Sequence, residues 1–265
     1  MKRVIFNQKG GVGKTSISCN LAAISAWKGF KTLLIDLDIQ GNSSEYLVGE
    51  QFRDLEDNAA SFFKQKLALF GKSKDARDCI YQTEFDNLFL MPSSTELAVI
   101  ERELESRHKI YKLRDALREL EKDYEHIYID TPPALNFYSR SALIAADSLV
   151  IPFDCDSFSQ GALMGLLETV EEIREDHNPG LQLEGIVVNQ FQAQASLPTQ
   201  LVDSLRANEL PVFEQYLSSS VKMKESRSRQ LPLVHLAPSH KLTQQLIALH
   251  DSLSSATGGK AARSA

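Results

Sequence analysis

The stretch "NQKGGVGKTS", residues 7–16, decides the fold of this chain. It follows the apolar run "RVIF" (Arg3 to Phe6), which predicts a buried strand, and it precedes a segment in which Ile17, Leu21 and Ile24 repeat at helical spacing. Glycines in a turn between strand and helix let the backbone bend sharply. The N–H groups there, together with the positive end of the helix dipole, attract an anion. The stretch therefore predicts a phosphate-binding loop.

The end of this loop has the residue types that bind a nucleotide and its metal ion. Lys14 is placed for the β- and γ-phosphates, and the Thr15 hydroxyl for Mg²⁺. The commonest phosphate loop has a glycine where this chain has Gln8, and it needs only one lysine, whereas Lys9 is a second one here. The residues expected to contact the nucleotide are Gly10, Gly11, Val12, Gly13, Lys14, Thr15 and Ser16.

The second lysine has an explanation in a family resemblance. "KGGVGKT", residues 9–15, resembles the deviant Walker A motif of the ParA/MinD ATPases, the family that also contains the nitrogenase iron protein. The resemblance implies that Lys9 crosses a dimer interface to the nucleotide of the other subunit, and that Lys14 is the ordinary phosphate-loop lysine. It also implies ATP and Mg²⁺ as cofactors and a weak, Mg²⁺-dependent ATP hydrolase activity.

Two aspartates follow the second expected strand, where ligands of an open parallel sheet bind. "LLIDLDIQGN" contains Asp36 and Asp38 and is similar to the family's D-x-D-x-Q-G segment. The similarity implies that Asp38 positions or activates the attacking water and that Asp36 supports the phosphate loop, with Gln40 a weaker candidate in the same switch. Judged by itself, an aspartate such as Asp36 could equally cap a turn. Ile39 stands where partition ATPases often have proline.

Two further strand ends carry polar residues. "HIYIDTPP" is an apolar strand ending in Asp130, as in a Walker B segment, and such a carboxylate can hold Mg²⁺ through a coordinated water. Thr15 and Asp130 are therefore the expected metal site. Asn189 in "IVVNQF" resembles the family's adenine-reading residue, and an Asx-turn is the alternative.

Strand-like runs alternate with helical patterns along the whole chain, which predicts an α/β fold: a doubly wound, mostly parallel sheet with helices on both faces. We expect one P-loop ATPase domain over residues 1–253 and a disordered tail over 254–265. A capping-box pattern at Ser93 or Ser94 predicts the start of a helix, and residues 51–85 are weakly patterned. The expected strands after the first are "KTLLIDLD", "NLFLMP", "HIYIDTPP", "SLVIPF", "EGIVVNQF" and "LPVFEQYL" (210–217).

Charge and cysteine content limit the possible partners. The chain has 265 residues and a net charge of −6, so binding to DNA or anionic lipid would need a local basic patch. "VKMKESRSRQ" is the candidate DNA-binding patch, although charge runs are usually solvated helix faces. The three cysteines form no C-x-x-C pair, and a strand begins almost at Met1, so we expect a cytoplasmic protein. The basic residues of the patch are Lys222, Lys224, Arg227 and Arg229.

The resemblance extends to the late segment and is greatest to the short ParA-type partition and positioning ATPases. It implies an ATP-dependent homodimer that binds non-specific DNA and is nucleoid-associated when ATP-bound. It also implies a ParB-like protein or cargo adaptor that stimulates hydrolysis. "YLSSS" replaces the family's I-P-R-N, and no helix-turn-helix precedes the loop, so we expect no operator binding. The alternatives are a MinD-like membrane positioner, which needs a terminal amphipathic helix, and a metabolic or electron-transfer relative. Cys79 and Cys155 do not fit an iron–sulfur site.

Overall fold

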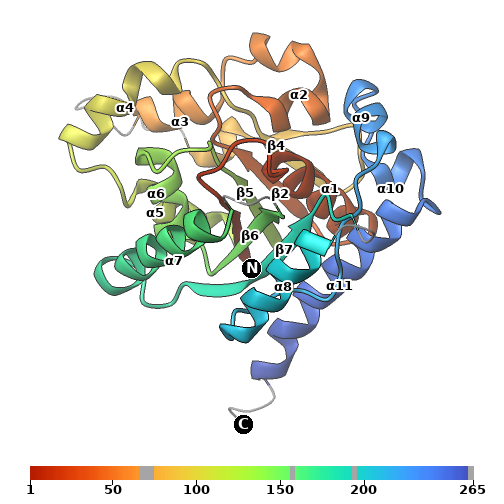
Figure 1. Cartoon of the computed structure of the whole chain (residues 1–265). Coiled ribbons are helices and arrows are strands. Elements are labelled where there is room, and N and C mark those ends of the chain that lie inside the picture. Colours follow the sequence, from red (N-terminus) through yellow and green to blue (C-terminus); the bar gives the residue numbers. More distant parts are fainter. Residues whose placement is uncertain (66–74, 156–158, 193–195, 262–265) are drawn as a thin grey trace.

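The centre of the molecule is a sheet with the strand order β3-β4-β2-β5-β1-β6-β7 (Figure 1). The computed structural model describes residues 1–65, 75–155, 159–192 and 196–261. Neighbouring strands pair in parallel except for β3 and β4, which are antiparallel. The strands are β1 (Lys2–Ile5), β2 (Thr32–Asp36), β3 (Tyr81–Gln82), β4 (Leu88–Met91), β5 (His126–Asp130), β6 (Ser148–Asp154) and β7 (Gln182–Asn189).

Helices cover both faces of this sheet, as the doubly wound prediction requires (Figure 1). Two short 3₁₀ helices, η1 (Glu50–Asp54) and η2 (Ala76–Cys79), lie in the weakly patterned region. The α-helices are α1 (Lys14–Trp27), α2 (Asn42–Val48), α3 (Ala59–Gln65), α4 (Leu97–Ser106), α5 (Lys112–Leu120), α6 (Phe137–Ala145), α7 (Ser159–Asp176), α8 (Ser196–Ala207), α9 (Val221–Ser228), α10 (Leu233–Leu236) and α11 (Lys241–Ala261).

Each central strand contributes to two apolar clusters, one on either face. Side chains alternate between the faces along a strand, so Leu33 and Ile35 join the cluster under α3 to α7, while Leu34 joins the one under α1, α2 and α11. These side chains are fully buried, and burial of one such residue contributes about 1.5–3 kcal/mol. The sheet is therefore a rigid platform that fixes the positions of its strand ends.

The structure differs from one sequence prediction, the strand over residues 210–217, and it adds regular elements elsewhere. Residues 210–217 are not a strand: Val212 makes an isolated bridge to Ile186 of β7, Pro211 has no N–H to donate, and beyond Phe213 the hydrogen bonding to β7 resumes at Leu217 N. The helix α11 runs to Ala261 and so includes part of the segment predicted to be disordered. Its buried Leu242, Leu246 and Leu249 fix the start, and no proline ends it earlier. Within the weakly patterned region, α3 and β3 are regular elements.

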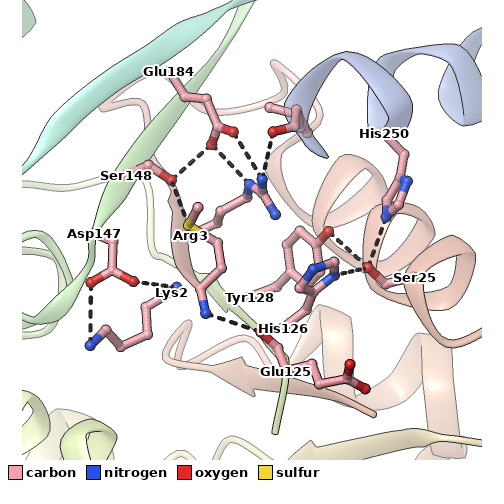
Figure 2. Close-up of polar contacts among 12 residues, drawn as sticks. Lys2, Arg3, Ser25, Glu125, His126, Tyr128, Asp147, Ser148, Glu184 and His250 are labelled. Carbon is pink, nitrogen blue, oxygen red and sulfur yellow. Dashed lines mark hydrogen bonds and ion pairs between the residues drawn. The ribbon is translucent and has the colours of Figure 1, made fainter. Parts of the chain in front are cut away.

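A buried polar cluster joins the amino ends of the strands to α11 (Figure 2). Arg3 donates from Nε and Nη2 to the Glu184 carboxylate at 2.8 and 2.9 Å, and from Nη2 to the Leu253 carbonyl oxygen at 2.9 Å. Since Arg3 is only 1% exposed, the ion pair is shielded from water. It fastens α11 beside the start of β1.

The Ser25 hydroxyl is the second centre of this cluster (Figure 2). It lies 2.6 Å from His126 Nδ1, 2.9 Å from His250 Nε2 and 3.1 Å from the Tyr128 hydroxyl. A hydroxyl has one proton to donate and two lone pairs, so three partners use its full capacity. Through Ser25, the helix α1 is bound to β5 and to α11.

Candidate nucleotide-binding site

The loop between β1 and α1 has the backbone geometry of a phosphate cradle. Gly11 (φ 78°) and Gly13 (φ 94°) are in the left-handed region, which favours glycine. Space is open where a Cβ on Gly10 or Gly11 would lie, but a Cβ on Gly13 would be 2.2 Å from Asn189 Nδ2. The helix α1 starts at Lys14 without a side-chain cap, so its first-turn N–H groups can bind an anion.

The Lys14 side chain lies back across this cradle. Its ammonium donates to the Lys9 carbonyl oxygen at 2.9 Å, and the residue is only 7% exposed. Burial lowers the pKa of Lys14, while the charges of Asp130 and Asp38 raise it. A phosphate in the loop would therefore gain a poorly solvated ammonium as its partner.

Lys9 forms an ion pair inside its own subunit. Its ammonium donates to both oxygens of Asp154, at the end of β6, with distances of 2.8 and 2.7 Å. The Asn7 side chain supports this turn by accepting from Lys9 N and donating to the Pro152 carbonyl oxygen. The Lys9 side chain is 30% exposed. Contact with a second subunit's nucleotide stays a prediction, and it would require this ion pair to open.

Asp130 lies at the carboxyl end of β5, beside the loop. Its carboxylate accepts from the hydroxyls of Thr15 at 2.9 Å, Ser43 at 2.7 Å and Ser18 at 3.1 Å. Burial raises the pKa of Asp130, while these hydrogen bonds lower it. In the part of the chain that the structure describes, no group of three or more His, Cys, Asp or Glu side chains could hold a metal ion. The Thr15 hydroxyl and the Asp130 carboxylate, which lie 2.9 Å apart, are oxygen donors that fit Mg²⁺, since this ion takes few protein ligands alongside phosphate and water.

The aspartates of the switch segment lie next to this position. Asp36 and Asp130 are partners in the β2–β5 register, and burial followed by the Asp130 charge raises the pKa of Asp36 to about 8. Asp36 accepts from the backbone of Asp38 and from Ser44. It thus contacts the switch segment itself. Asp38 is 7% exposed, and its carboxylate accepts from Gln40 N at 3.0 Å.

A cavity of about 200 Å³ continues from the loop to α9. Asn189 Nδ2 donates to the Val12 carbonyl oxygen at 2.8 Å, so this side chain braces the loop. Gln190 supports the loop in the same way, through Gly11. Contact of Asn189 with adenine stays a prediction. The cavity is lined by Gly11, Ser16, Ile17, Asn189, Gln190, Leu217, Ser218, Ser219, Ser220, Met223, Lys224, Arg227 and Leu242.

The predicted DNA patch occupies α9 and the residue after it. Glu225 pairs with Lys222 at 2.6 Å and with Arg229 at 3.2 Å, which reduces their attraction for phosphate. Lys224 and Arg227 are exposed, and they also line the cavity beside the loop. The patch is therefore adjacent to the nucleotide site. A larger cavity, of about 430 Å³, lies between α4, α6 and α7, away from these residues.

Sequence reasoning missed several residues of the site. Asp154, which holds Lys9, is a strand-end residue like Asp130, and the same criterion would have found it. Ser43 and Ser44 follow the aspartates in the sequence, but nothing in their local pattern predicts contacts with Asp130 and Asp36.

Together these features define a P-loop ATPase: a strand followed by a glycine loop, then Lys14 and Thr15, with Asp130 at a neighbouring strand end. A family model described as an AAA domain matches residues 2–183. The chromosome partitioning protein ParA of Myxococcus xanthus is 34% identical over 87% of this chain and 79% of its own length. The sporulation initiation inhibitor protein Soj of Bacillus subtilis is 32% identical over 88% of this chain and 90% of its own. The chain belongs to the ParA/MinD family of deviant Walker A ATPases, as a partition-type member.

Solved structures support the same fold. McdA from Cyanothece, in a complex with ATP, has a TM-score of 0.83 with 23% identity and covers 96% of both chains. Cobyrinic acid a,c-diamide synthase from Mycobacterium smegmatis, with a bound ATP analog and magnesium, has a TM-score of 0.81 with 22% identity, over 94% of this chain and 92% of that one. In the described ranges, the helices are too short or too polar for a membrane span.

Proposed function

We propose that this chain is a ParA-type switch that dimerises around ATP, binds DNA non-specifically in that state and positions a cargo. A ParB-like protein or cargo adaptor stimulates hydrolysis and ends the DNA-bound state. The observation that carries the proposal is the pair of lysines on one loop: Lys14 lies inside the cradle, whereas Lys9 is at its rim and partly exposed. A phosphate loop needs one lysine for its own nucleotide, so the second, partly exposed ammonium group supports a contact with another subunit.

Within one subunit, the side chains have separable tasks. Lys14 neutralises charge on the β- and γ-phosphates, while Thr15 and Asp130 would hold the metal ion. When bound, Mg²⁺ would neutralise charge on the phosphate oxygens. Asp38 orients the attacking water, and Asn189 reads the adenine edge from the cavity of about 200 Å³ beside the loop.

The positive charges around one nucleotide, from Lys14 and the metal ion, are joined by Lys9 only in a dimer, because Lys9 comes from the other subunit. In one subunit its ammonium is held by Asp154. When two subunits meet face to face, Lys9 exchanges this carboxylate for the triphosphate of the other copy, which carries more negative charge. ATP thereby becomes part of the interface, and its hydrolysis removes the charge that holds the copies together.

The helix α9 carries the basic patch that would bind DNA, and it lies beside the cavity next to the loop. A net charge of −6 opposes binding to a polyanion, but a dimer places two copies of the basic patch on one particle, and counterion release then favours association. Lys224 and Arg227 are the strongest candidates, because Glu225 pairs with Lys222 and Arg229 instead. The names of the ParA relatives, which refer to chromosome partitioning, support this reading.

The test measures dimerisation and DNA binding with ATP against ADP. In the Asp38→Ala variant with Mg²⁺–ATP, we expect a stable dimer that retards unrelated DNA duplexes with a steep salt dependence. The double variant Lys224→Ala/Arg227→Ala should lose most DNA binding, and its ATP affinity and dimerisation are measured in parallel because both side chains line the cavity beside the loop. Its control is Lys122→Ala/Arg174→Ala, which removes two exposed charges from elsewhere on the surface. A chain that stays monomeric with ATP contradicts the proposal.

A further inference from the structure

Both polar backbone groups of Asp38 are held by buried side chains. Its N–H donates to Asp36 Oδ1 at 3.1 Å, and its carbonyl oxygen accepts from the Ser93 hydroxyl at 2.5 Å. Ser93 is 1% exposed and lies just after β4, 55 residues along the chain. The peptide groups on either side of the Asp38 Cα are therefore fixed from two different strand ends.

Asp36 and Ser93 are also joined to each other, through Ser44 in α2. Asp36 Oδ2 accepts from both N and Oγ of Ser44, each at 2.8 Å, and Ser44 Oγ accepts from Ser93 N at 2.9 Å. Asp36, Ser44, Ser93 and Asp38 thus close a ring of hydrogen bonds. Asp36 and Ser44 are fully buried, so water does not compete for these bonds and they hold the segment in one conformation.

This ring determines where the Asp38 carboxylate lies. Gln40 N donates to Asp38 Oδ1 at 3.0 Å, and Gly41 N donates to the Asp38 carbonyl oxygen at 2.9 Å. The turn after Asp38 is therefore hydrogen-bonded to Asp38 as well. The carboxylate is close enough to Lys14 for its charge to raise the pKa of that ammonium. The switch segment therefore faces the cradle, and none of the four residues in the ring belongs to the phosphate loop, residues 7–16.

We propose that Ser93 is a positioning residue for ATP hydrolysis, which holds the Asp38 peptide so that the carboxylate faces the attacking water. The inference rests on the proposed function, because it takes Asp38 as the group that orients this water. Misplacement of a reacting or orienting group lowers the rate steeply. Ser93 bonds to switch residues and not to Lys14, Thr15 or Asp130. Its loss should therefore affect turnover and leave ATP affinity unchanged.

The experiment compares single-turnover hydrolysis of Mg²⁺–ATP with the equilibrium affinity for ATP. Ser93→Ala should hydrolyse about tenfold more slowly and bind ATP within about twofold of the unmodified chain. The matched control is Ser94→Ala, which removes a hydroxyl one residue further on that accepts only from Glu96 N. This control should have the unmodified rate. If Ser93→Ala does not fold, Ser93→Cys gives the same comparison, since a thiol keeps the shape but donates weakly.

A double variant separates positioning from a merely structural effect. If Ser93 acts through Asp38, Ser93→Ala should cause no further loss in the Asp38→Ala background. A normal rate in Ser93→Ala, or the same tenfold loss without Asp38, overturns the inference and leaves the proposed function intact. Normal hydrolysis in Asp38→Ala would instead remove the role of Asp38 from the proposed function, and the inference would be lost with it.

Discussion

Lowering the pH should weaken the fold through His126, whose ring lies against Ser25 at the amino end of β5 (Figure 2). Burial, followed by the charges of Arg3 and His250, lowers the pKa of His126 to about 4. An unfolded chain has a histidine pKa of about 6.5, so between these values the unfolded state binds the proton. The stabilisation by neutral His126 is complete above about pH 6.5 and is lost as the pH falls towards about 4.

The size of this effect follows from the two pKa values. Each pKa unit corresponds to about 1.4 kcal/mol, so the interval from 6.5 to about 4 gives an upper bound of about 3.5 kcal/mol. The ring is only partly buried, and water screens part of the interaction. Between pH 7 and pH 5 we therefore expect a loss of about 1.5 kcal/mol in the free energy of unfolding that is due to His126.

The assay is urea denaturation at pH 7 and pH 5 for the unmodified chain and for His126→Asn. Asparagine keeps a hydrogen-bonding atom close to the position of Nδ1 but does not titrate. Asp36, with its pKa raised to about 8, changes stability in the opposite direction, because its folded form holds a proton that the unfolded form releases. That contribution is present in both proteins and cancels in the difference. An equal loss of stability in both proteins refutes the reasoning.

Three further substitutions test other parts of the structure. Gly13→Ala should abolish ATP binding measured by equilibrium dialysis, because φ is 94° and the new Cβ would lie 2.2 Å from a side-chain amide of β7; retained affinity contradicts the loop geometry. Arg3→Met should lower the free energy of unfolding by about 3–5 kcal/mol, since it leaves the Glu184 carboxylate buried without its partner. Lys28→Met, which removes an exposed ion pair, is the control and should cost less than about 1 kcal/mol. Lys9→Ala should bind ATP normally but stay monomeric by sedimentation; an ATP-dependent dimer would remove Lys9 from the interface.

The polar residues at the ends of the buried strands could be predicted from sequence, because the apolar run and the aspartate that follows it are adjacent in the chain. Asp38 and Asp130 each follow an apolar run, and parallel strands bring their carboxyl ends to one edge of the sheet. The structure places both beside Lys14. The apolar pattern of residues 210–217 predicts a strand as well, but there Val212 makes an isolated bridge to β7 and the hydrogen bonding resumes at Leu217, a slip that the pattern does not contain.

The ring around Asp38 could not be predicted in this way. Ser93 and Ser94 read as the start of a capping box, but α4 begins at Leu97 and only Ser94 contributes near its start, by accepting from Glu96 N. The Ser93 hydroxyl bonds instead to a carbonyl oxygen 55 residues away. A contact of this kind depends on the spacing of β2 and β4 in the sheet, and no short window of sequence contains that information.

The attachment of α11 has a practical consequence for labelling. Arg3 and Ser25 hold this helix at Leu253 and His250, beside the amino ends of the strands, while the phosphate cradle lies at their carboxyl ends. The last turns of α11 continue away from the sheet (Figure 1). A fluorescent reporter or a surface tether fused after this helix would therefore lie on the side of the molecule opposite the phosphate cradle.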